Sequence, residues 1–194
     1  SKDFKKEFKK FFKLNKINIY NFIESKKQIN KLSKYKIEKC FFSNSKKVIN
    51  ILSVGRLVKQ KDQITILKAL NLIKNNKNFK FYLIGKGKEL DNLNEYIKKN
   101  QLKNKVKIID YQNNIYPYYM KSDVFIMSSL YEGLPNTLIE AVTLGVPIIS
   151  SDCKTGPREI LNKQKYGKLF KIGDYKNLSK LILKSKKKKE SNLF

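Results

Sequence analysis

From residue 48 onward, short apolar runs alternate with segments of helical periodicity. The runs are rich in β-branched and aromatic residues, and the helical segments space apolar residues by three and four, as at Ile66, Ala69, Leu70 and Ile73. This alternation is typical of βα units that build a parallel sheet covered by helices. We therefore predict an α/β fold, a Rossmann-like doubly wound parallel sheet of about six strands. The predicted strands are 48–54, 79–84, 106–109, 124–127, 146–149 and 168–171.

The predicted helices follow these strands in turn. The first begins near Asp62, a residue suited to the N-cap, and the last begins near Asp174. The others are expected at 90–97, 116–121 and 136–144. Right-handed crossovers and the usual strand order 3-2-1-4-5-6 would place the first and fourth strands side by side. A ligand is then expected between the loops that follow Val54 and Met127.

The charge of the chain has two interpretations. Lys and Arg number 43 against 16 Asp and Glu, a net charge of +27, yet only Arg56 and Arg158 are arginines. Nucleic-acid-binding surfaces favour arginine, whose planar group makes two-point contacts with guanine and phosphate, so nucleic acid is not an expected partner. Abundant Lys, Asn, Ile, Phe and Tyr indicate the composition of an AT-rich genome. The alternative is attraction to an anionic membrane surface.

Several classes of site are excluded by composition. The chain has no histidine, which rules out a Ser-His-Asp triad and any His-ligated metal. Cys40 and Cys153 stand apart without CxxC spacing, so we expect a reducing compartment and no zinc or disulfide, and Cys153 has no histidine to activate it as a nucleophile. No apolar run approaches 18 residues. We expect a cytoplasmic protein without a bound metal, either free or peripheral on the inner face of the plasma membrane.

The sequence divides into three parts. Residues 1–45 do not follow the βα repeat, and we interpret them as the tail of a preceding domain plus a linker. Residues 46–183 form the predicted domain. Residues 184–194 are a basic C-terminal tail, for which a solvated, frayed end is the expected structure.

The segment 128–145, SSLYEGLPNTLIEAVTLG, contains the first candidate site. Gly133 and Pro135 shape a turn at a helix entrance, where the first N–H groups lack backbone partners and the helix dipole favours an anion. Glu132 precedes this turn and Glu140 lies one turn inside the helix, and both carboxylates are suited to accept hydrogen bonds from sugar hydroxyls. In the alternative interpretation, Glu132 caps the loop and Glu140 is solvated.

The loop after the first strand contains the second candidate site. Its cations are Arg56, Lys59 and Lys61. Arg56 is suited to grip a diphosphate with its planar fork, and Lys61 to act as a point charge, whereas Lys59 fits an ordinary surface lysine. Gly85-Lys86-Gly87 lacks the phosphate-loop fingerprint and is interpreted as a strand-end turn.

Taken together, these motifs closely resemble the nucleotide-sugar half of the family 4 glycosyltransferases over about residues 17–180. The Glu132/Glu140 pair, with seven residues between, is the most specific feature. The other matching motifs are Gly55-Arg56-Leu57 with Lys61, Tyr131 to Asn136, Gly145-Val146-Pro147, Ser151-Asp152-Cys153 and Gly156 to Leu161. The resemblance implies a GT-B protein, with two Rossmann-like domains facing a cleft, of which this chain is the C-terminal, donor-binding domain.

The resemblance also implies a role for each site residue. Arg56 and Lys61 would bind the donor diphosphate, Glu132 the donor sugar hydroxyls and Glu140 the ribose hydroxyls. Glu132, Arg56 and Lys61 would act in catalysis, and the implied binding residues are Gly55, Arg56, Lys61, Gly133, Leu134, Pro135, Asn136, Thr137 and Glu140. The chain departs from the family pattern at Phe22, where proline is usual, and at Asp110 beside the expected base site, where glycine is usual.

The activity implied is a retaining, metal-independent transfer of sugar from a UDP- or GDP-sugar to a glycan, such as a lipid-linked or surface polysaccharide. No cofactor is expected beyond this donor. Without its N-terminal acceptor domain, the chain is expected to bind a nucleoside diphosphate but to transfer sugar poorly. One alternative is a non-catalytic nucleotide-sugar-binding module that needs a partner chain, and another is a basic protein that associates with membranes or nucleic acid.

Overall fold

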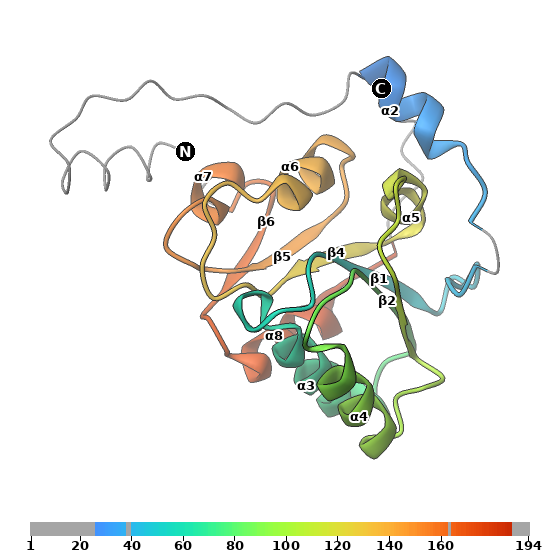
Figure 1. Ribbon diagram of the computed structural model, residues 1–194, viewed down its shortest axis with the longest axis vertical. Coiled ribbons are helices and arrows are strands. Elements are labelled where there is room, and N and C mark those ends of the chain that lie inside the picture. Colours follow the sequence, from blue (N-terminus) through green and yellow to red (C-terminus); the bar gives the residue numbers. More distant parts are fainter. Residues whose placement is uncertain (1–25, 38–39, 163, 188–194) are drawn as a thin grey trace, which may run out of the picture.

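A computed structural model describes residues 26–37, 40–162 and 164–187 of the chain. These residues form one six-stranded sheet between two layers of helices (Figure 1). All strand pairs are parallel and the order is β3-β2-β1-β4-β5-β6, which confirms the predicted fold class and strand order. The strands are β1 (Ile49–Val54), β2 (Phe79–Ile84), β3 (Val106–Ile109), β4 (Val124–Met127), β5 (Ile148–Ser151) and β6 (Gly167–Phe170).

The helices cover both faces of the sheet (Figure 1). One layer holds α3 (Gln63–Ile73), α4 (Leu90–Lys99) and α8 (Tyr175–Lys184), and the other holds α2 (Lys26–Ser33), α5 (Tyr116–Lys121), α6 (Asn136–Thr143) and α7 (Pro157–Ile160). A short 3-10 helix, η1 (Lys59–Lys61), precedes α3. Because successive strand residues point to opposite faces, Ile51 enters one apolar core and Leu52 the other.

The predicted bounds of β2, β3 and β4 agree with the structure, and the ends of the other strands differ. β5 begins at Ile148, two residues later than predicted, because the Val146 N–H donates to the Ala141 carbonyl at the end of α6 and Pro147 has no N–H. β6 begins one residue early because Gly167 pairs with Ile148. Asp62 occupies the N-cap of α3 as predicted, but its carboxylate accepts the Thr65 hydroxyl rather than a backbone N–H.

Part of the predicted linker packs on the domain. Helix α2 was not predicted from the sequence; it lies against α5 and buries Ile29. Tyr82 of β2 fixes the segment that follows, because its hydroxyl accepts the Phe41 N–H at 2.5 Å and its ring meets the Phe42 ring edge-on at 4.5 Å. The expected tail of a preceding domain, within 1–25, lies outside the described residues.

The start of the predicted C-terminal tail is held against the amino edge of the sheet. Lys184 belongs to α8, and the Lys187 ammonium lies 3.1 Å from the carboxylate of buried Asp123. The same carboxylate accepts the Asn50 N–H of β1 at 2.8 Å. The Lys187 side chain is therefore not frayed, whereas Lys184 and Lys186 are exposed as expected, and residues 188–194 lie outside the described part of the chain.

We expect Asp123→Ala to lower the free energy of unfolding by about 3 kcal/mol, because the buried Asn50 N–H loses its acceptor. Lys187→Ala should cost about 1 kcal/mol or less, since its side chain is 28% exposed. Urea denaturation of both variants measures the two losses. If both variants lost the same free energy of unfolding, the hydrogen bond from Asn50 to Asp123 would not be the main contribution of Asp123 to stability.

Candidate functional site

The loops after β1 and β2 are joined backbone to backbone at the carboxyl edge of the sheet. The Leu57 N–H donates to the Lys86 carbonyl at 2.8 Å. A side chain at Gly85 would overlap the Gly55 carbonyl, and one at Gly87 would overlap the Leu57 carbonyl. Both glycines have positive φ angles of 154°. The segment is thus a strand-end turn, as predicted, and its glycines let the two loops touch.

The loops after β1 and β4 are also joined, which confirms that the switch point of the sheet brings them together. The Leu130 N–H donates to the Gln60 carbonyl at 2.8 Å, and the Gln60 side chain donates to the Tyr131 carbonyl at 2.9 Å. Farther in, the Ser128 hydroxyl donates to the Lys61 carbonyl at 2.8 Å. The predicted site residues on these loops therefore share one framework.

Lys61 and Glu132 form an ion pair across the two loops. The Lys61 Nζ lies 2.5 Å from Glu132 Oε1, and the Ser129 hydroxyl donates to the same oxygen at 2.6 Å. The side chains are only 18% and 7% exposed, respectively. A cation and an anion from different strands are thus held together at the carboxyl edge, and neither long side chain is a freely solvated surface group.

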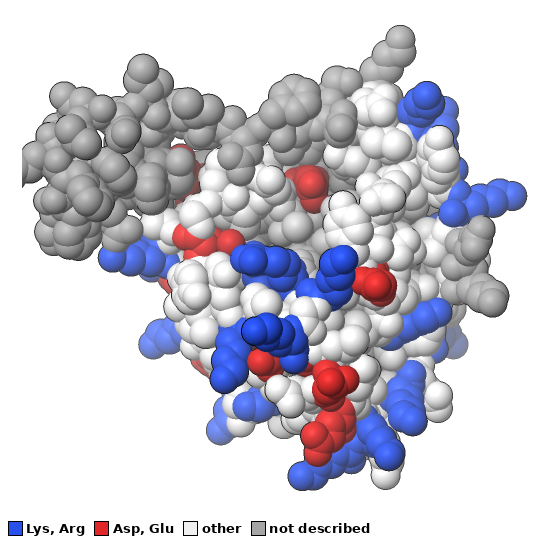
Figure 2. Space-filling view, viewed as in Figure 1, with Lys and Arg blue, Asp and Glu red and all other residues white. Residues whose placement is uncertain are grey.

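Arg56 has a fixed backbone and an exposed side chain. Its carbonyl accepts the Gln63 side-chain amide at 2.8 Å, while one guanidinium nitrogen lies 3.5 Å from the Gln60 side-chain oxygen. The guanidinium is therefore accessible to a ligand at the edge where Lys61 is partly buried. The exposed cations of the β1 and β2 loops are Arg56, Lys59, Lys86 and Lys88. Figure 2 shows Lys and Arg gathered in the middle of the face that presents these loops.

Glu140 points to a tyrosine of a neighbouring helix. Its Oε2 lies 3.0 Å from the hydroxyl of Tyr119 on α5, and that hydroxyl also lies 2.9 Å from the Thr137 carbonyl. Burial raises the pKa of Glu140, and the Tyr119 hydrogen bond opposes the rise. Burial raises the pKa of Tyr119 well above its usual value, so the phenol keeps its proton. The alternative that Glu140 is a solvated helix residue is therefore wrong.

Helix α6 begins where the sequence predicted. The carbonyl of buried Pro135 accepts the Leu138 and Ile139 N–H groups at 3.1 and 3.3 Å, which sets the first turn of the helix. Glu132 and Gly133 precede this turn, and Asn136 opens the helix. The predicted anion cradle, 133–137, therefore coincides with a helix entrance beside the β1 loop.

The loop after β5 supports the β4 loop from behind. The Thr155 hydroxyl donates to the Glu132 carbonyl. Gly156 lies so close to the turn that a Cβ there would stand 2.7 Å from Pro135 Cδ and 2.9 Å from the Gly133 carbonyl oxygen. Thr155 and Gly156 therefore contact the backbone of the turn that carries Glu132 and help to fix its position.

The same β5 loop is closed by an ion pair. The Arg158 guanidinium donates two hydrogen bonds of 2.6 Å to the Asp152 carboxylate, and these hold the pKa of that carboxyl below its usual value. Between them, Cys153 is 1% exposed, and burial raises its pKa to about 11. The thiol is thus protonated at neutral pH, which agrees with the sequence argument against a cysteine nucleophile.

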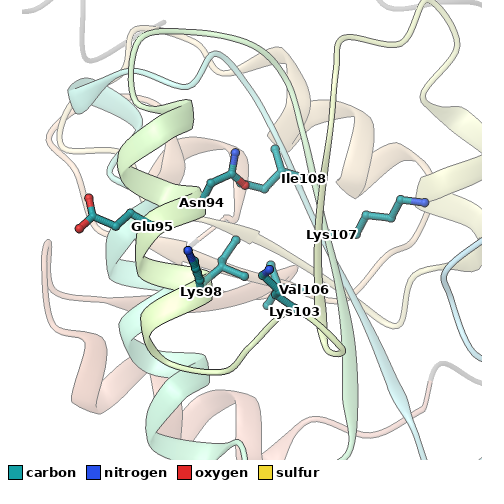
Figure 3. Close-up of a pocket in the computed structure, with 8 residues that line it drawn as sticks. Asn94, Glu95, Lys98, Lys103, Val106, Lys107 and Ile108 are labelled. Atoms are coloured by element: carbon teal, nitrogen blue, oxygen red, sulfur yellow. The ribbon is translucent and has the colours of Figure 1, made fainter.

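A groove of about 600 Å³ lies elsewhere, between α4 and the edge strand β3 (Figure 3). Its lining residues are Asn94, Glu95, Ile97, Lys98, Lys103, Val106, Lys107 and Ile108. In Figure 3, Glu95 and Lys107 point away from each other on opposite sides of the groove. Since its charged groups do not converge and it contains no predicted site residue, we assign it no role.

The supporting residues Tyr119, Ser129 and Thr155 were not predicted from the sequence. Ser129 lies three residues before Glu132, which is a usable local signal. Tyr119 and Thr155 are 21 and 23 residues from their partners, so only the topology brings them there. Within the described ranges, no three Asp, Glu or Cys side chains are grouped so as to hold a metal ion.

Comparison with known proteins gives this arrangement a context. A family model described as glycosyl transferases group 1 matches residues 34–193. An uncharacterized glycosyltransferase of Methanocaldococcus jannaschii is 37% identical over 148 residues, or 76% of this chain and 36% of that protein. The amylovoran biosynthesis glycosyltransferase AmsD of Erwinia amylovora is 40% identical over 124 residues, or 63% of this chain and 34% of AmsD.

A third relative carries a specific name. The N-acetylgalactosamine-N,N'-diacetylbacillosaminyl-diphospho-undecaprenol 4-alpha-N-acetylgalactosaminyltransferase of Campylobacter jejuni is 34% identical over 122 residues, or 63% of this chain and 33% of that enzyme. The chain thus spans about a third of the length of these curated relatives.

Solved structures share the fold. S. aureus TarM, in a complex with fondaparinux, alpha-GlcNAc-glycerol and UDP, has a TM-score of 0.75 at 22% identity over 92% of this chain and 34% of TarM. Anabaena HepE with UDP-glucose has a TM-score of 0.67 at 21% identity over 82% of this chain and 43% of HepE. At these identities, the similarity shows the fold alone.

Replacing Lys61 with methionine would leave the Glu132 carboxylate buried without its cation. We expect Lys61→Met to lower the free energy of unfolding by about 2 kcal/mol at pH 7. The double variant Lys61→Met/Glu132→Gln should recover part of this loss, because it removes both charges. A double-mutant cycle by urea denaturation should give a coupling of about 1 kcal/mol or more, and strictly additive losses would contradict the pair.

Glu140 should make stability depend on pH. Because its folded-state pKa is raised, the folded chain binds more protons than the unfolded chain between the two pKa values, and stability falls as pH rises through that interval. Glu140→Gln is therefore expected to raise the free energy of unfolding at pH 7 by up to about 1 kcal/mol, with the gain vanishing at acidic pH.

Denaturation of Glu140→Gln and wild type from pH 4 to 8 measures this difference. The matched control is Glu95→Gln on α4, where the side chain is exposed and the substitution should change little at any pH. A stability gain that persists at acidic pH would contradict the buried-charge explanation.

Proposed function

The chain belongs to the glycosyl transferase group 1 family, and on that premise we propose that it is the C-terminal, donor-binding domain of a family 4 enzyme of the GT-B type. The observation that carries the proposal is the Lys61–Glu132 pair, which lies where the strand order of the sheet reverses and beside the exposed Arg56. Doubly wound sheets bind ligands in the crevice outside the carboxyl ends of their strands at such a point.

The proposed donor is a UDP- or GDP-sugar. A lysine ammonium has three N–H donors, so a Lys61 that gives one to Glu132 retains two for phosphate oxygens. Arg56 offers its fork from the exposed side, and the entrance of α6 adds the positive end of a helix dipole. These three sources of positive charge all lie on the two joined loops, which suits them to a diphosphate.

The two carboxylates are assigned to the sugars of the donor. Glu132 Oε1 is engaged by Lys61 and Ser129, and we assign Oε2 to hydroxyls of the transferred sugar. Glu140 Oε2 contacts Tyr119, and we assign its Oε1 to the ribose hydroxyls. A carboxylate repels a phosphate, but it accepts strong hydrogen bonds from neutral hydroxyls. Sugar hydroxyls are therefore suitable partners for both glutamates.

In the proposed reaction, the bond between the anomeric carbon of the sugar and the nucleoside diphosphate oxygen breaks while a bond from that carbon to an acceptor hydroxyl forms. The hydroxyl proton passes to the released nucleoside diphosphate or to solvent, and negative charge builds up on the leaving phosphate. Arg56, Lys61 and the entrance of α6 would stabilise that charge from positions fixed before the reaction, which lowers the barrier. Following the sequence resemblance, we propose that the transfer is retaining and independent of metal.

The proposed acceptor is a growing lipid-linked or surface glycan. The names of the Campylobacter jejuni and Erwinia amylovora relatives, which refer to an undecaprenol-linked sugar and to amylovoran, support this class. Because the matched part of this chain covers only about a third of those relatives, we propose that an N-terminal domain or a partner chain supplies the acceptor site. Among the described residues, no helix is long and apolar enough to cross a bilayer. Action at the inner membrane face stays part of the proposal.

We expect Arg56→Ala to weaken UDP or GDP binding by at least about tenfold, because a charge-assisted contact to the diphosphate is lost. Lys59→Ala is the matched control, since it removes the same charge from the same exposed loop and should change affinity by less than about twofold. Isothermal titration calorimetry measures both affinities. Equal weakening by the two variants, or parallel loss of binding to anionic liposomes, would favour a purely electrostatic surface over a donor site.

A further inference from the structure

We propose that Tyr119 is a positioning residue for the nucleotide: its hydroxyl holds one oxygen of the Glu140 carboxylate so that the other faces the ribose. The ribose-binding role of Glu140 rests on the proposed function, whereas the contact between Tyr119 and Glu140 does not depend on it. Tyr119 lies on α5 and Glu140 on α6, and the hydroxyl-to-carboxylate distance is 3.0 Å. None of the sequence motifs described above includes Tyr119.

Tyr119 is itself held rigidly. Its side chain is fully buried, and its ring packs on Phe125 of β4 with the ring centroids 5.4 Å apart. The hydroxyl therefore occupies a place set by the sheet rather than by a mobile side chain. Because β4 also leads into the loop that carries Glu132, one strand fixes the positions of both proposed sugar-binding carboxylates.

A glutamate needs such a support to recognise two vicinal hydroxyls. Its side chain has three rotatable bonds, and freezing them when the ligand binds costs affinity. A hydrogen bond to Oε2 fixes the plane of the carboxylate before the ligand arrives. Tyr119 thus orients the Glu140 carboxylate before ribose binds, so that the ligand does not have to do so.

The same hydrogen bond favours the charged form of Glu140. Burial on its own favours the neutral carboxyl, and donation from Tyr119 acts in the opposite direction. Of the titratable groups packed around this pair, Tyr119 acts on Glu140 from α5, and Tyr116 of the same helix acts on Tyr119. A neutral Glu140 offers fewer acceptor sites to the ribose. The Tyr119 hydroxyl therefore orients the Glu140 carboxylate and also favours the charged form that binds ribose more strongly.

The rival explanation is structural. The Tyr119 hydroxyl also lies 2.9 Å from the Thr137 carbonyl in the first turn of α6, and it could serve only to join the two helices. That role would affect stability and every ligand of the site equally. The positioning role would affect the titration of Glu140 and only those ligands that carry ribose hydroxyls.

The first test follows the titration of Glu140 by NMR of the carboxyl carbon in the full chain without ligand. In Tyr119→Phe, the Glu140 pKa should rise, because the opposing hydrogen bond is gone. Placing 3-fluorotyrosine at position 119 should lower the Glu140 pKa, because the hydroxyl becomes a stronger donor. Tyr118→Phe is the matched control, since that ring packs on Tyr82, and it should leave the Glu140 titration unchanged. An unchanged Glu140 titration in both Tyr119 variants would overturn the inference.

The second test compares the binding of UDP and 2′,3′-dideoxyuridine diphosphate by calorimetry. We expect Tyr119→Phe to weaken UDP binding by about tenfold at pH 7 while the dideoxy analogue binds as it does to wild type. The loss of UDP affinity on acidification should begin at a higher pH in this variant. Equal weakening for both ligands would overturn the positioning role in favour of the structural one.

The two tests separate the inference from the function on which it rests. If wild type binds neither UDP nor GDP, the proposed function fails, while a shifted Glu140 titration still supports the Tyr119 contact. If wild type binds UDP and Tyr119→Phe binds it equally well at every pH, the proposed function stands and the positioning role fails.

Discussion

The site depends on one ion pair between two loops that are far apart in sequence. Lys61 follows β1 and Glu132 follows β4, and the parallel pairing of these strands places them within 2.5 Å. Taking two charges out of water is unfavourable, so such a pair is weak evidence of a contribution to stability. Its effect is geometric, because it holds a cation and a carboxylate beside each other at the carboxyl edge of the sheet, where we propose that the donor binds.

Three sets of hydrogen bonds fix the loops that carry this pair. The β1 loop is joined to the β2 loop through Leu57 and to the β4 loop through Gln60, while Thr155 supports the Glu132 carbonyl from the β5 loop. Glu140 shows the complementary strategy, in which burial raises its pKa and a tyrosine hydroxyl opposes that rise. Each of the two carboxylates is therefore partly buried and held by a donor from another element.

The sequence predicted elements well where their signals were local. The strand bounds 79–84, 106–109 and 124–127 were correct because each is a short run made mostly of aromatic and aliphatic residues, bounded by polar residues or glycine. The predicted start of β5 was wrong because Val146 and Pro147 belong to the connection after α6: the Val146 N–H bonds to the Ala141 carbonyl, and Pro147 has no N–H. Helix α2 was missed because its lysine-rich sequence offers only two apolar residues, Ile29 and Leu32, and the packing against α5 that buries Ile29 is not visible in the sequence. For the candidate site, the sequence singled out the motif residues, whereas the side chains that contact them, such as Tyr119 and Thr155, were not predicted.

By itself, the sequence determined the parallel α/β sheet, its strand order and the loops that carry Arg56, Lys61, Glu132 and Glu140. These follow from hydrophobic periodicity and motif spacing, which operate over short stretches of chain. Only the tertiary structure decided what each side chain contacts: Lys61 with Glu132, Tyr119 with Glu140 and Thr155 with the Glu132 carbonyl. The reason is physical, because partners more than 20 residues apart meet only through crossover connections, and side-chain direction and burial are properties of the packed sheet rather than of any one segment.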